Sequence, residues 1–265
     1  MKILLTGASG QVGYELERSL QGLGEVVAVD RARMDLADLD QVRDVIRAVR
    51  PQLIVNPAAY TAVDKAESEP ELARRVNAQA PEVMAREAKA LGAALVHYST
   101  DYVFDGSKQG AYVETDPTNP LNVYGQTKLE GEQAIAASGA RHLIFRTSWV
   151  YGMRGKNFLL TMLRLGKERE ELRVVDDQHG APTWSRTIAD TTAVVLAQAR
   201  AEGWWERHGG IYHLSSRGQT TWCGFTQAIM AGAGLSCRVT PITSAEYPVP
   251  ARRPANSVMN AEKLT

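Results

Sequence analysis

Short hydrophobic runs alternate with longer amphipathic stretches through the first half of the chain. The runs are rich in Val, Ile and Leu without strict apolar–polar alternation, which is typical of strands buried on both faces of a parallel sheet. They predict strands in these segments: KILLTG, EVVAVD, QLIVNPAA, AALVHYST and RHLIFRTSWV. Strands and helices that alternate this often predict a doubly wound α/β fold of the Rossmann type.

The amphipathic stretches between these runs predict the helices of that fold. They lie over residues 12–24, 39–51, 70–92 and 120–139. The first is expected to end at Gly22 or Gly24, the second at Pro51 and the last near Gly139, because glycine and proline end helices. The third is expected to be interrupted near Pro81.

The pattern changes after Trp149. NFLLTMLRLGKEREELRVV is expected to form one long helix that leads to a strand, and loops rich in Pro and Gly follow around residues 180–182 and 247–254. We expect GGIYHLSS to return a strand to the main sheet. The prediction is therefore two interleaved units: a domain over residues 1–150, rejoined by about 185–216, and a smaller C-terminal lobe of 151–184 and 217–265.

Composition narrows the class of protein. The chain has 265 residues, of which 44% are hydrophobic, a normal share for a globular protein. Lys+Arg and Asp+Glu both number 30, and no basic cluster indicates binding to nucleic acid or to a membrane surface. The apolar runs are too short to span a bilayer, and MKILLTGASG is typical of a buried strand rather than a signal peptide.

Cysteine and histidine give no sign of a disulfide framework or a metal site. Cys223 and Cys237 are the two cysteines, and the 5 histidines are scattered without metal-ligand spacing. We expect a cytoplasmic protein with reduced thiols and no bound metal.

Three regularly spaced glycines follow the first predicted strand, in GASGQVG. Glycine permits a tight turn and a close backbone approach, and the N-terminus of the following helix attracts a pyrophosphate. The spacing is G-x-x-G-x-x-G, but the strand before it and the helix after it are those that a dinucleotide site requires. We expect a nicotinamide dinucleotide to contact these residues: Gly7, Ser9, Gly10, Gln11, Val12 and Gly13.

Asp30 ends the second predicted strand, where an acidic residue can hold the adenosine ribose. A carboxylate there favours NADH, because it repels the 2′-phosphate of NADPH. Arg31 and Arg33 follow at once and could accept that phosphate, so the sequence leaves both coenzymes open. Asp35 and Leu36 are expected to reach the adenine, with an N-terminal helix cap as the alternative.

The candidate catalytic residues are Thr100, Tyr124 and Lys128. Thr100 ends the fourth predicted strand, and the carboxyl ends of strands in such a sheet face the ligand crevice. YGQTK places Tyr124 and Lys128 four residues apart, on one face of a helix that begins near the same edge. All three side chains can therefore meet beside a nicotinamide.

The chemistry gives each of these three residues a role. The pKa of tyrosine is near 10, and a lysine ammonium at ~4 Å, worth roughly 1–4 kcal/mol, would lower it by about 1–3 pH units. Tyr124 can then give a proton to a carbonyl oxygen as hydride reaches its carbon. Lys128 can hold the nicotinamide ribose, and Thr100 can orient the reacting oxygen.

Longer blocks of the sequence resemble a known family. The glycine trio, Asp30, Thr100 and YGQTK are together similar to the extended short-chain dehydrogenase/reductase superfamily. The chain resembles its dTDP-4-dehydrorhamnose reductases throughout, in NPAAYTAVDKAESEP, VHYSTDYVFDG, PLNVYGQTKLEGE, IFRTSWVYG, TMLRLGKEREELRVVDDQHGAPT and PARRPANS. The resemblance implies that NADPH or NADH reduces the 4-keto group of dTDP-4-dehydro-L-rhamnose.

The resemblance also implies roles for further residues. It places these against the cofactor: Ala58, Ala59, Tyr60 and Thr61. It places these against the sugar nucleotide: Thr100, Asp101, Tyr124, Trp149, Asn157 and Arg252. Trp149 offers an aromatic face to a sugar ring, and Arg252 or Arg253 a forked grip on the diphosphate. Residues 1–150 would then bind NAD(P), and the smaller lobe the substrate.

Magnesium is implied for some members of this family, held by acidic side chains between two subunits. Glu15 and Asp190 are acidic here, but the segment 184–186 carries no carboxylate. We therefore expect no magnesium site, while a monomer and a homodimer both stay open.

Other functions share the same fold and the Tyr–Lys pair. Dehydratases of the superfamily carry an acid directly after the Thr–Asp pair, where this chain has Tyr102, which counts against dehydration. An epimerase keeps its nicotinamide bound, and the sequence does not exclude one. A non-catalytic relative, the regulatory subunit of animal methionine adenosyltransferase, is disfavoured because Thr100, Tyr124 and Lys128 are all present.

Overall fold

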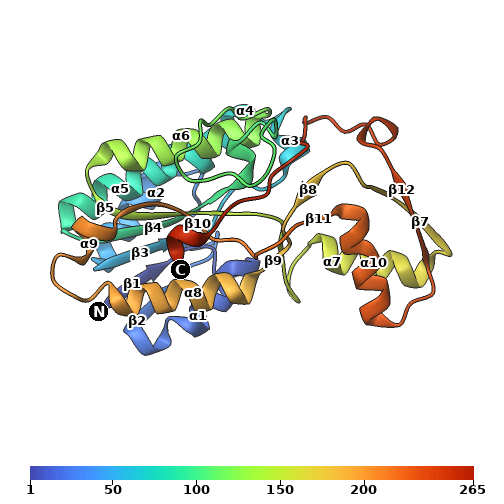
Figure 1. The fold of residues 1–265 in the computed structure, drawn as a ribbon. Helices are drawn as coiled ribbons and strands as arrows, with labels where there is room; N and C mark the ends of the chain where they lie inside the picture. Colours follow the sequence, from blue (N-terminus) through green and yellow to red (C-terminus); the bar gives the residue numbers. More distant parts are fainter.

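A parallel sheet of six strands forms the centre of the protein, in a computed structural model that describes residues 1–265. The strands are β1 (Lys2–Leu5), β2 (Glu25–Ala28), β3 (Leu53–Asn56), β4 (Ala94–Thr100), β5 (Arg141–Thr147) and β10 (Gly210–His213). They lie in the order β10-β5-β4-β3-β1-β2 (Figure 1). The doubly wound α/β fold is confirmed, and the strand order reverses beside β1, where such sheets open a ligand crevice.

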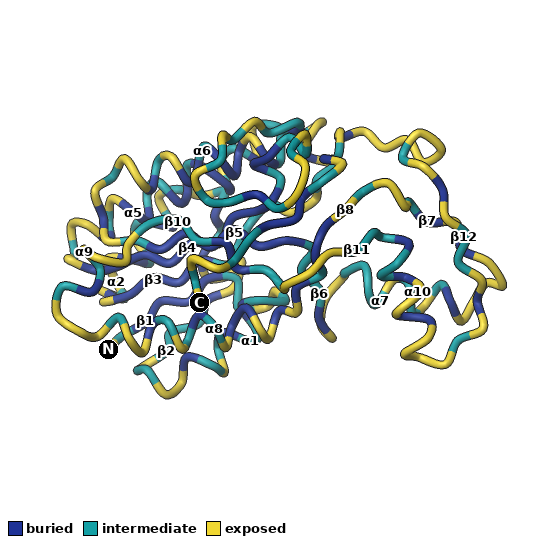
Figure 2. Tube along the Cα trace, viewed as in Figure 1, coloured by how far each residue is buried: buried dark blue, intermediate teal, exposed yellow.

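Helices cover both faces of this sheet. α1 (Gln11–Ser19) and α8 (Ser185–Gln198) pack on one face. α2 (Leu39–Val49), α5 (Ala80–Leu91) and α6 (Val123–Ser138) pack on the other. Each face has its own apolar core, because successive strand residues point to opposite sides. Figure 2 shows that the buried residues follow the strands and the inner sides of these helices.

The helix ends lie close to the predicted ones. α2 ends before Pro51, and α6 ends at Gly139, which takes the left-handed conformation common after helices. α1 instead ends before the predicted Gly22 or Gly24, and a short 3₁₀ turn follows it. A Cβ on Gly24 would lie 1.9 Å from the Met1 carbonyl oxygen, so this glycine permits a close approach of two strand ends rather than ending the helix.

The helix predicted over residues 70–92 is interrupted just before Pro81. α4 (Pro70–Arg74) and α5 are joined by one π-helical turn, Arg75–Gln79. Pro81 lies at the start of α5, a position that its fixed φ angle favours. The π turn points Asn77 into the interior, where the residue is 1% exposed.

The smaller lobe lies beside the sheet (Figure 1). Its elements are β6 (Val150–Tyr151), α7 (Phe158–Glu168), β7 (Glu171–Val175), β8 (His179–Gly180), β9 (Thr183–Trp184), β11 (Thr220–Thr221), α10 (Trp222–Ala233) and β12 (Arg238–Ile242). The predicted helix and strand after Trp149 are confirmed as α7 and β7, and β7 pairs with β12. The loop predicted around residues 180–182 is instead flanked by β8 and β9, which pair with β11 and β6.

Two short helices complete the structure: α3 (Val63–Ala66), after β3, and α9 (Trp204–His208), before β10. The strand predicted in GGIYHLSS is β10, which pairs with β5 at the edge of the main sheet. Cys223 and Cys237 are buried in the apolar core of the smaller lobe as free thiols. None of the helices combines the length and the hydropathy needed to cross a lipid bilayer.

Candidate active site

The glycine-rich turn between β1 and α1 is built for close contacts. Gly7 has a φ of +57°, and a Cβ on Gly13 would lie 2.1 Å from the Gly7 carbonyl oxygen. A Cβ on Gly7 would meet Ala58 at 3.0 Å. No side chain caps α1, so its first N–H groups can bind an anion, which fits a dinucleotide pyrophosphate. Ser9 is exposed at this turn, and Val12 packs against the sheet core.

Gln11 and Asn157 join this turn to the smaller lobe. Asn157 Nδ2 donates to Gln11 Oε1 and to a backbone carbonyl, both at 2.8 Å. Asn157 Oδ1 accepts the N–H of Leu160 at 3.0 Å and so caps α7. Because both ends of the Asn157 amide are used within the protein, the geometry does not favour the predicted substrate contact.

Asp30 and Asp35 are the carboxylates predicted at the adenosine end of the cofactor, and both already bond within the protein. Asp30 is exposed, and its Oδ1 accepts two N–H groups of the following turn. Asp35 pairs with Arg31 at 3.2 Å, and Leu36 is buried. The alternative of a helix cap in MDLAD is confirmed, since Asp38, the last residue of that segment, caps α2. Asp30 and Arg31 stand side by side in the chain, and the geometry favours neither coenzyme.

The chain after β3 passes the glycine turn and is fixed there by Asn77. The Tyr60 N–H donates to Asn77 Oδ1 at 2.8 Å, and Asn77 Nδ2 donates to the Tyr60 carbonyl at 3.1 Å. The Tyr60 hydroxyl donates to Glu69 at 2.6 Å, and burial, with this bond, raises the pKa of Tyr60 to about 12. These bonds hold Ala59 and Thr61, the neighbours of Tyr60, in a fixed stretch of backbone.

Tyr124 lies in the first turn of α6, which packs against the end of β4. Asn122 caps this helix by accepting the N–H of Gly125 at 2.8 Å. A Cβ on Gly125 would lie 2.2 Å from the carbonyl oxygen of Tyr102, so this glycine lets α6 approach the 3₁₀ turn of residues 101–103, which follows β4, closely. The Tyr124 ring then packs edge-on against Tyr102, and its hydroxyl meets Thr100, which ends β4. The structure therefore brings Thr100 and Tyr124 together.

The surroundings of Tyr124 raise its pKa rather than lowering it. Burial raises the pKa of Tyr124 to about 12, while a hydrogen bond with Thr100 opposes the rise and the Asp101 carboxylate adds to it. The Lys128 amine donates to the Tyr98 carbonyl at 2.6 Å. The prediction that Lys128 lowers the Tyr124 pKa is therefore wrong for this structure, because the amine is engaged elsewhere. Tyr124 is a protonated phenol at neutral pH.

Lys128 is fully buried, with 1% of its surface exposed. Burial lowers the pKa of Lys128 to about 8, and the Glu132 carboxylate acts in the opposite direction. Glu132 is itself paired with Arg146 at 2.7 Å in the same interior. The Lys128 amine also lies 3.1 Å from Nε2 of His97.

Asp101 presents a buried carboxyl group beside Thr100. Its Oδ1 accepts the Thr100 hydroxyl proton at 2.9 Å. The Ser257 hydroxyl lies near enough to lower the Asp101 pKa, but the buried Oδ2 makes no hydrogen bond within normal distance. Burial raises the pKa of Asp101 to about 6. Buried polar atoms are nearly always hydrogen-bonded, so an unpaired oxygen at this edge fits a bond from a substrate hydroxyl.

One face of the Trp149 ring is covered within the protein. The ring stacks on Trp222 with centroids 3.5 Å apart and planes 7° from parallel. A Cβ on Gly180 would lie 2.4 Å from the same ring, so Gly180 also packs closely against it. A sugar ring therefore cannot pack on the face that Trp222 covers, and a contact elsewhere on Trp149 stays a prediction. Trp149 also has a φ of +45°, a strained conformation often retained at binding sites.

The two arginines of the ARRP segment are in different situations. Arg253 pairs with Asp64 at 2.8 Å, and Asp64 also accepts the Ala251 N–H at 3.2 Å. Arg252 is exposed, and its carbonyl accepts Asn122 Nδ2 at 2.8 Å. Of the pair, Arg252 therefore has the guanidinium available for a diphosphate.

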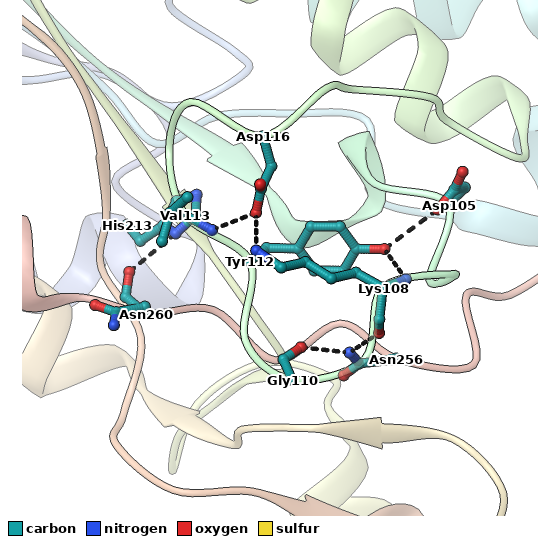
Figure 3. A network of polar contacts seen from close by, with 9 residues as sticks. All are labelled: Asp105, Lys108, Gly110, Tyr112, Val113, Asp116, His213, Asn256 and Asn260. Carbon is teal, nitrogen blue, oxygen red and sulfur yellow. Dashed lines mark hydrogen bonds and ion pairs between the residues drawn. The ribbon is translucent and has the colours of Figure 1, made fainter.

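A C-terminal strap, residues 251–260, returns from the smaller lobe across the main domain. Figure 3 shows the polar contacts that fix it to the loop after β4. Asn256 Nδ2 donates to the carbonyls of Lys108 and Gly110, both at 2.8 Å. The Tyr112 backbone bonds to the strap through both its N–H and its carbonyl. The Tyr112 hydroxyl donates to Asp105 at 3.2 Å within the loop.

The acidic residues considered for magnesium bond within the protein. Glu15 faces Arg186 at 3.9 Å, and Asp190 accepts the Ser19 hydroxyl at 2.6 Å.

Several residues of this region were missed from the sequence: Asn56, Asn77, His97, Asn122 and Trp222. One signal for Asn56 and His97 was available, since each is a polar residue inside an otherwise apolar buried strand. The roles of the others depend on contacts between distant segments, which the local pattern does not reveal.

Comparison with known proteins gives the family. The family model described as "RmlD substrate binding domain" matches residues 1–265. A dTDP-4-dehydrorhamnose reductase of Burkholderia thailandensis is 54% identical, over 100% of this chain and 92% of its own.

Solved structures of relatives agree with this. That of a dTDP-4-dehydrorhamnose reductase from Clostridium acetobutylicum has a TM-score of 0.93 and 39% identity, covering 99% of this chain and 91% of its own. That of the Bacillus anthracis enzyme, in complex with NADP, has a TM-score of 0.90 and 36% identity, with the same coverage. The chain belongs to the RmlD substrate binding domain family and, within it, to the dTDP-4-dehydrorhamnose reductases.

Proposed function

We propose that this protein reduces the 4-keto group of dTDP-4-dehydro-L-rhamnose to give dTDP-L-rhamnose, with NADPH or NADH as the hydride source. The observation that carries the proposal is the meeting of Thr100 and Tyr124 at the carboxyl edge of the sheet, in a chain of the reductase family. The chemistry is an oxidoreductase reaction on a small nucleotide-sugar.

The cofactor would be held by the turn from Gly7 to Gly13 and by the fixed backbone at Tyr60. The N-terminus of α1 supplies N–H groups to its pyrophosphate. When bound, the reduced nicotinamide supplies the hydride. Lys128, at the inner end of the Tyr124 helix face, is the residue to hold the nicotinamide ribose.

Tyr124 would donate the proton that the new hydroxyl needs. Its raised pKa keeps the phenol protonated at neutral pH, so it acts as an acid toward the carbonyl oxygen of the sugar. Thr100 would orient that oxygen, since its hydroxyl lies at the end of β4 beside Tyr124.

The substrate would lie between the two units of the chain. We assign residues 1–150 and about 185–216 to the cofactor, and residues 151–184 and 217–265 to the sugar nucleotide. The unpaired Asp101 oxygen suits a sugar hydroxyl, and the exposed Arg252 guanidinium suits the diphosphate. Trp149 would contact the sugar away from the ring face that Trp222 covers.

An epimerase is the second candidate, because it uses the same fold and the same tyrosine. One observation distinguishes an epimerase from a reductase. An epimerase is purified with its nicotinamide bound and consumes none, whereas a reductase oxidises one coenzyme for each sugar reduced.

The test is Tyr124→Phe, which removes the proton donor and keeps the ring that packs on Tyr102. We expect kcat to fall by about 10²–10⁴-fold, the usual share of a general acid, while NADPH binding is kept. The measurement is the loss of reduced-nicotinamide absorbance with dTDP-4-dehydro-L-rhamnose. The control is Tyr212→Phe, which removes a hydroxyl bonded to the His208 carbonyl away from the site. Wild-type turnover in Tyr124→Phe would refute the role of Tyr124.

A further inference from the structure

A closed chain of hydrogen bonds lies behind Lys128 and joins three strands of the sheet. His97, in β4, has Nε2 at 3.1 Å from the Lys128 amine and Nδ1 at 3.1 Å from Asn56 Nδ2. Asn56, at the end of β3, accepts the Thr6 hydroxyl on Oδ1 at 2.6 Å. Thr6 follows β1 directly. All four residues are at most 1% exposed.

The imidazole of His97 is neutral in this setting, and Lys128 is the group that titrates. Burial holds the pKa of His97 well below its ordinary value, and the nearby Lys128 charge acts in the same direction. Burial lowers the pKa of Lys128 to about 8. The charged groups around them are Glu132 from α6 and Arg146 from β5, which pair with each other. Asn56 and Thr6, from β3 and β1, carry no charge.

A neutral imidazole has one N–H and one lone pair, so its two contacts cannot both be of the same kind. When Nδ1 accepts from Asn56 Nδ2, the proton is on Nε2 and suits a neutral Lys128 amine. When the Asn56 amide is turned by half a rotation, Nδ1 donates to its oxygen and Nε2 accepts from a Lys128 ammonium. The bonds between Lys128, His97 and Asn56 are made in both arrangements, one for each charge state of the lysine; in the second, Asn56 Nδ2 donates to the Thr6 hydroxyl oxygen.

We propose that His97 is a positioning residue of the reduction, which fixes the Lys128 amine through Nε2 and changes tautomer with the charge of that lysine. The proposal rests on the proposed function for its place in the reaction. The positioning role explains why two buried strands rich in apolar residues contain His97 and Asn56. It gives Lys128 a fixed position at the end of a long, flexible side chain.

Two substitutions separate this role from simple packing. The amide of glutamine in His97→Gln reaches the place of Nε2 and can turn to donate or accept. The shorter amide of His97→Asn reaches only the place of Nδ1. In His97→Asn the Lys128 ammonium loses an acceptor, so we expect the loss of kcat at basic pH to begin about one to two pH units lower. Its kcat at neutral pH should fall about tenfold, because the amine loses its anchor. His97→Gln should stay within about threefold of the wild type.

The outcomes are distinct. A basic limb that moves in His97→Asn and is restored in His97→Gln supports the proposal. Equal losses in both variants with an unmoved pH profile indicate packing alone and overturn it. So do two variants that match the wild type.

A second measurement uses the wild-type protein and needs no activity. The ¹⁵N NMR shifts of His97 report which ring nitrogen is protonated. We expect the proton on Nδ1 at pH 6 and on Nε2 above the Lys128 pKa of about 8. Lys128→Met should abolish this change. One tautomer throughout the wild-type titration overturns the inference. A wild type that shows the change but does not reduce the sugar leaves the inference standing and refutes the proposed function.

Discussion

The buried Asp101 carboxyl group lowers the stability of the folded protein when it is ionised. It is 2% exposed, one of its oxygens has no hydrogen-bond partner, and its pKa is raised to about 6 by burial. A carboxylate in this position destabilises the folded protein unless something bonds to it. The cost is reasonable at a place where a ligand supplies the missing hydrogen bond.

The effect of Asp101 on the free energy of unfolding depends on pH. A carboxyl whose pKa is higher in the folded than in the unfolded protein stabilises the fold when protonated, and that contribution is lost as pH rises from about 4 to about 6. The loss amounts to about 3 kcal/mol at most in the free energy of unfolding. Asp101→Asn should abolish this part of the dependence, measured by urea unfolding at several pH values. Parallel curves for wild type and variant would contradict the raised pKa.

Residue positions were predicted from the sequence more reliably than residue environments. Strand ends and a four-residue spacing were enough to expect Thr100, Tyr124 and Lys128 at one edge. They could not show that the Lys128 amine would turn to His97 and Tyr98, because that depends on buried acceptors from another strand. The sequence could not show for the same reason that Trp149 stacks on Trp222, which lies far away in sequence.

At the scale of elements, the π turn of residues 75–79 and helix α6 fit one another. A Cβ on Gly131 of α6 would lie 2.2 Å from the carbonyl oxygen of Asn77 in the π turn. Pro81 has no N–H to bond that carbonyl in α-helical fashion. The close fit points the Asn77 side chain at Tyr60 and Thr127, so it places the cofactor loop against the catalytic helix.

Gly131→Ala should therefore lower both the stability of the protein and its affinity for the cofactor. The added methyl group must push the two helices apart, and we expect the protein to lose about 1–3 kcal/mol of unfolding free energy by overpacking. NADPH affinity should fall with it, because Asn77 holds Tyr60. The matched control is Gly232→Ala in α10, where nothing lies within 4 Å of the new methyl. At position 232, alanine should raise the free energy of unfolding by at most about 1 kcal/mol, because it has a higher helix propensity than glycine. Thermal unfolding of both variants is the measurement.

At the scale of the whole molecule, two units of the chain are joined by non-local contacts. The main sheet could be predicted because each strand is a continuous apolar run. The smaller lobe could be predicted only in outline, because β6, β8, β9 and β11 have two residues each and owe their pairing to distant partners. The C-terminal strap is also non-local: Arg253 pairs with Asp64, and Asn256 bonds to the loop after β4.

The strap passes the site with Arg252 on it, so its anchors should govern substrate affinity. Asn256→Ala removes two hydrogen bonds to the carbonyls of Lys108 and Gly110 and a third, from the Val258 N–H within the strap, each worth about 1 kcal/mol. We expect KM for the sugar nucleotide to rise several-fold, because a looser strap must be ordered on binding. The cofactor affinity should hold, since the glycine turn lies apart from these bonds. The control is Asn119→Ala, which breaks one bond to Asp105 within the loop and leaves the strap contacts intact. Equal effects of the two variants on KM would show that the loop, and not the strap, positions the substrate.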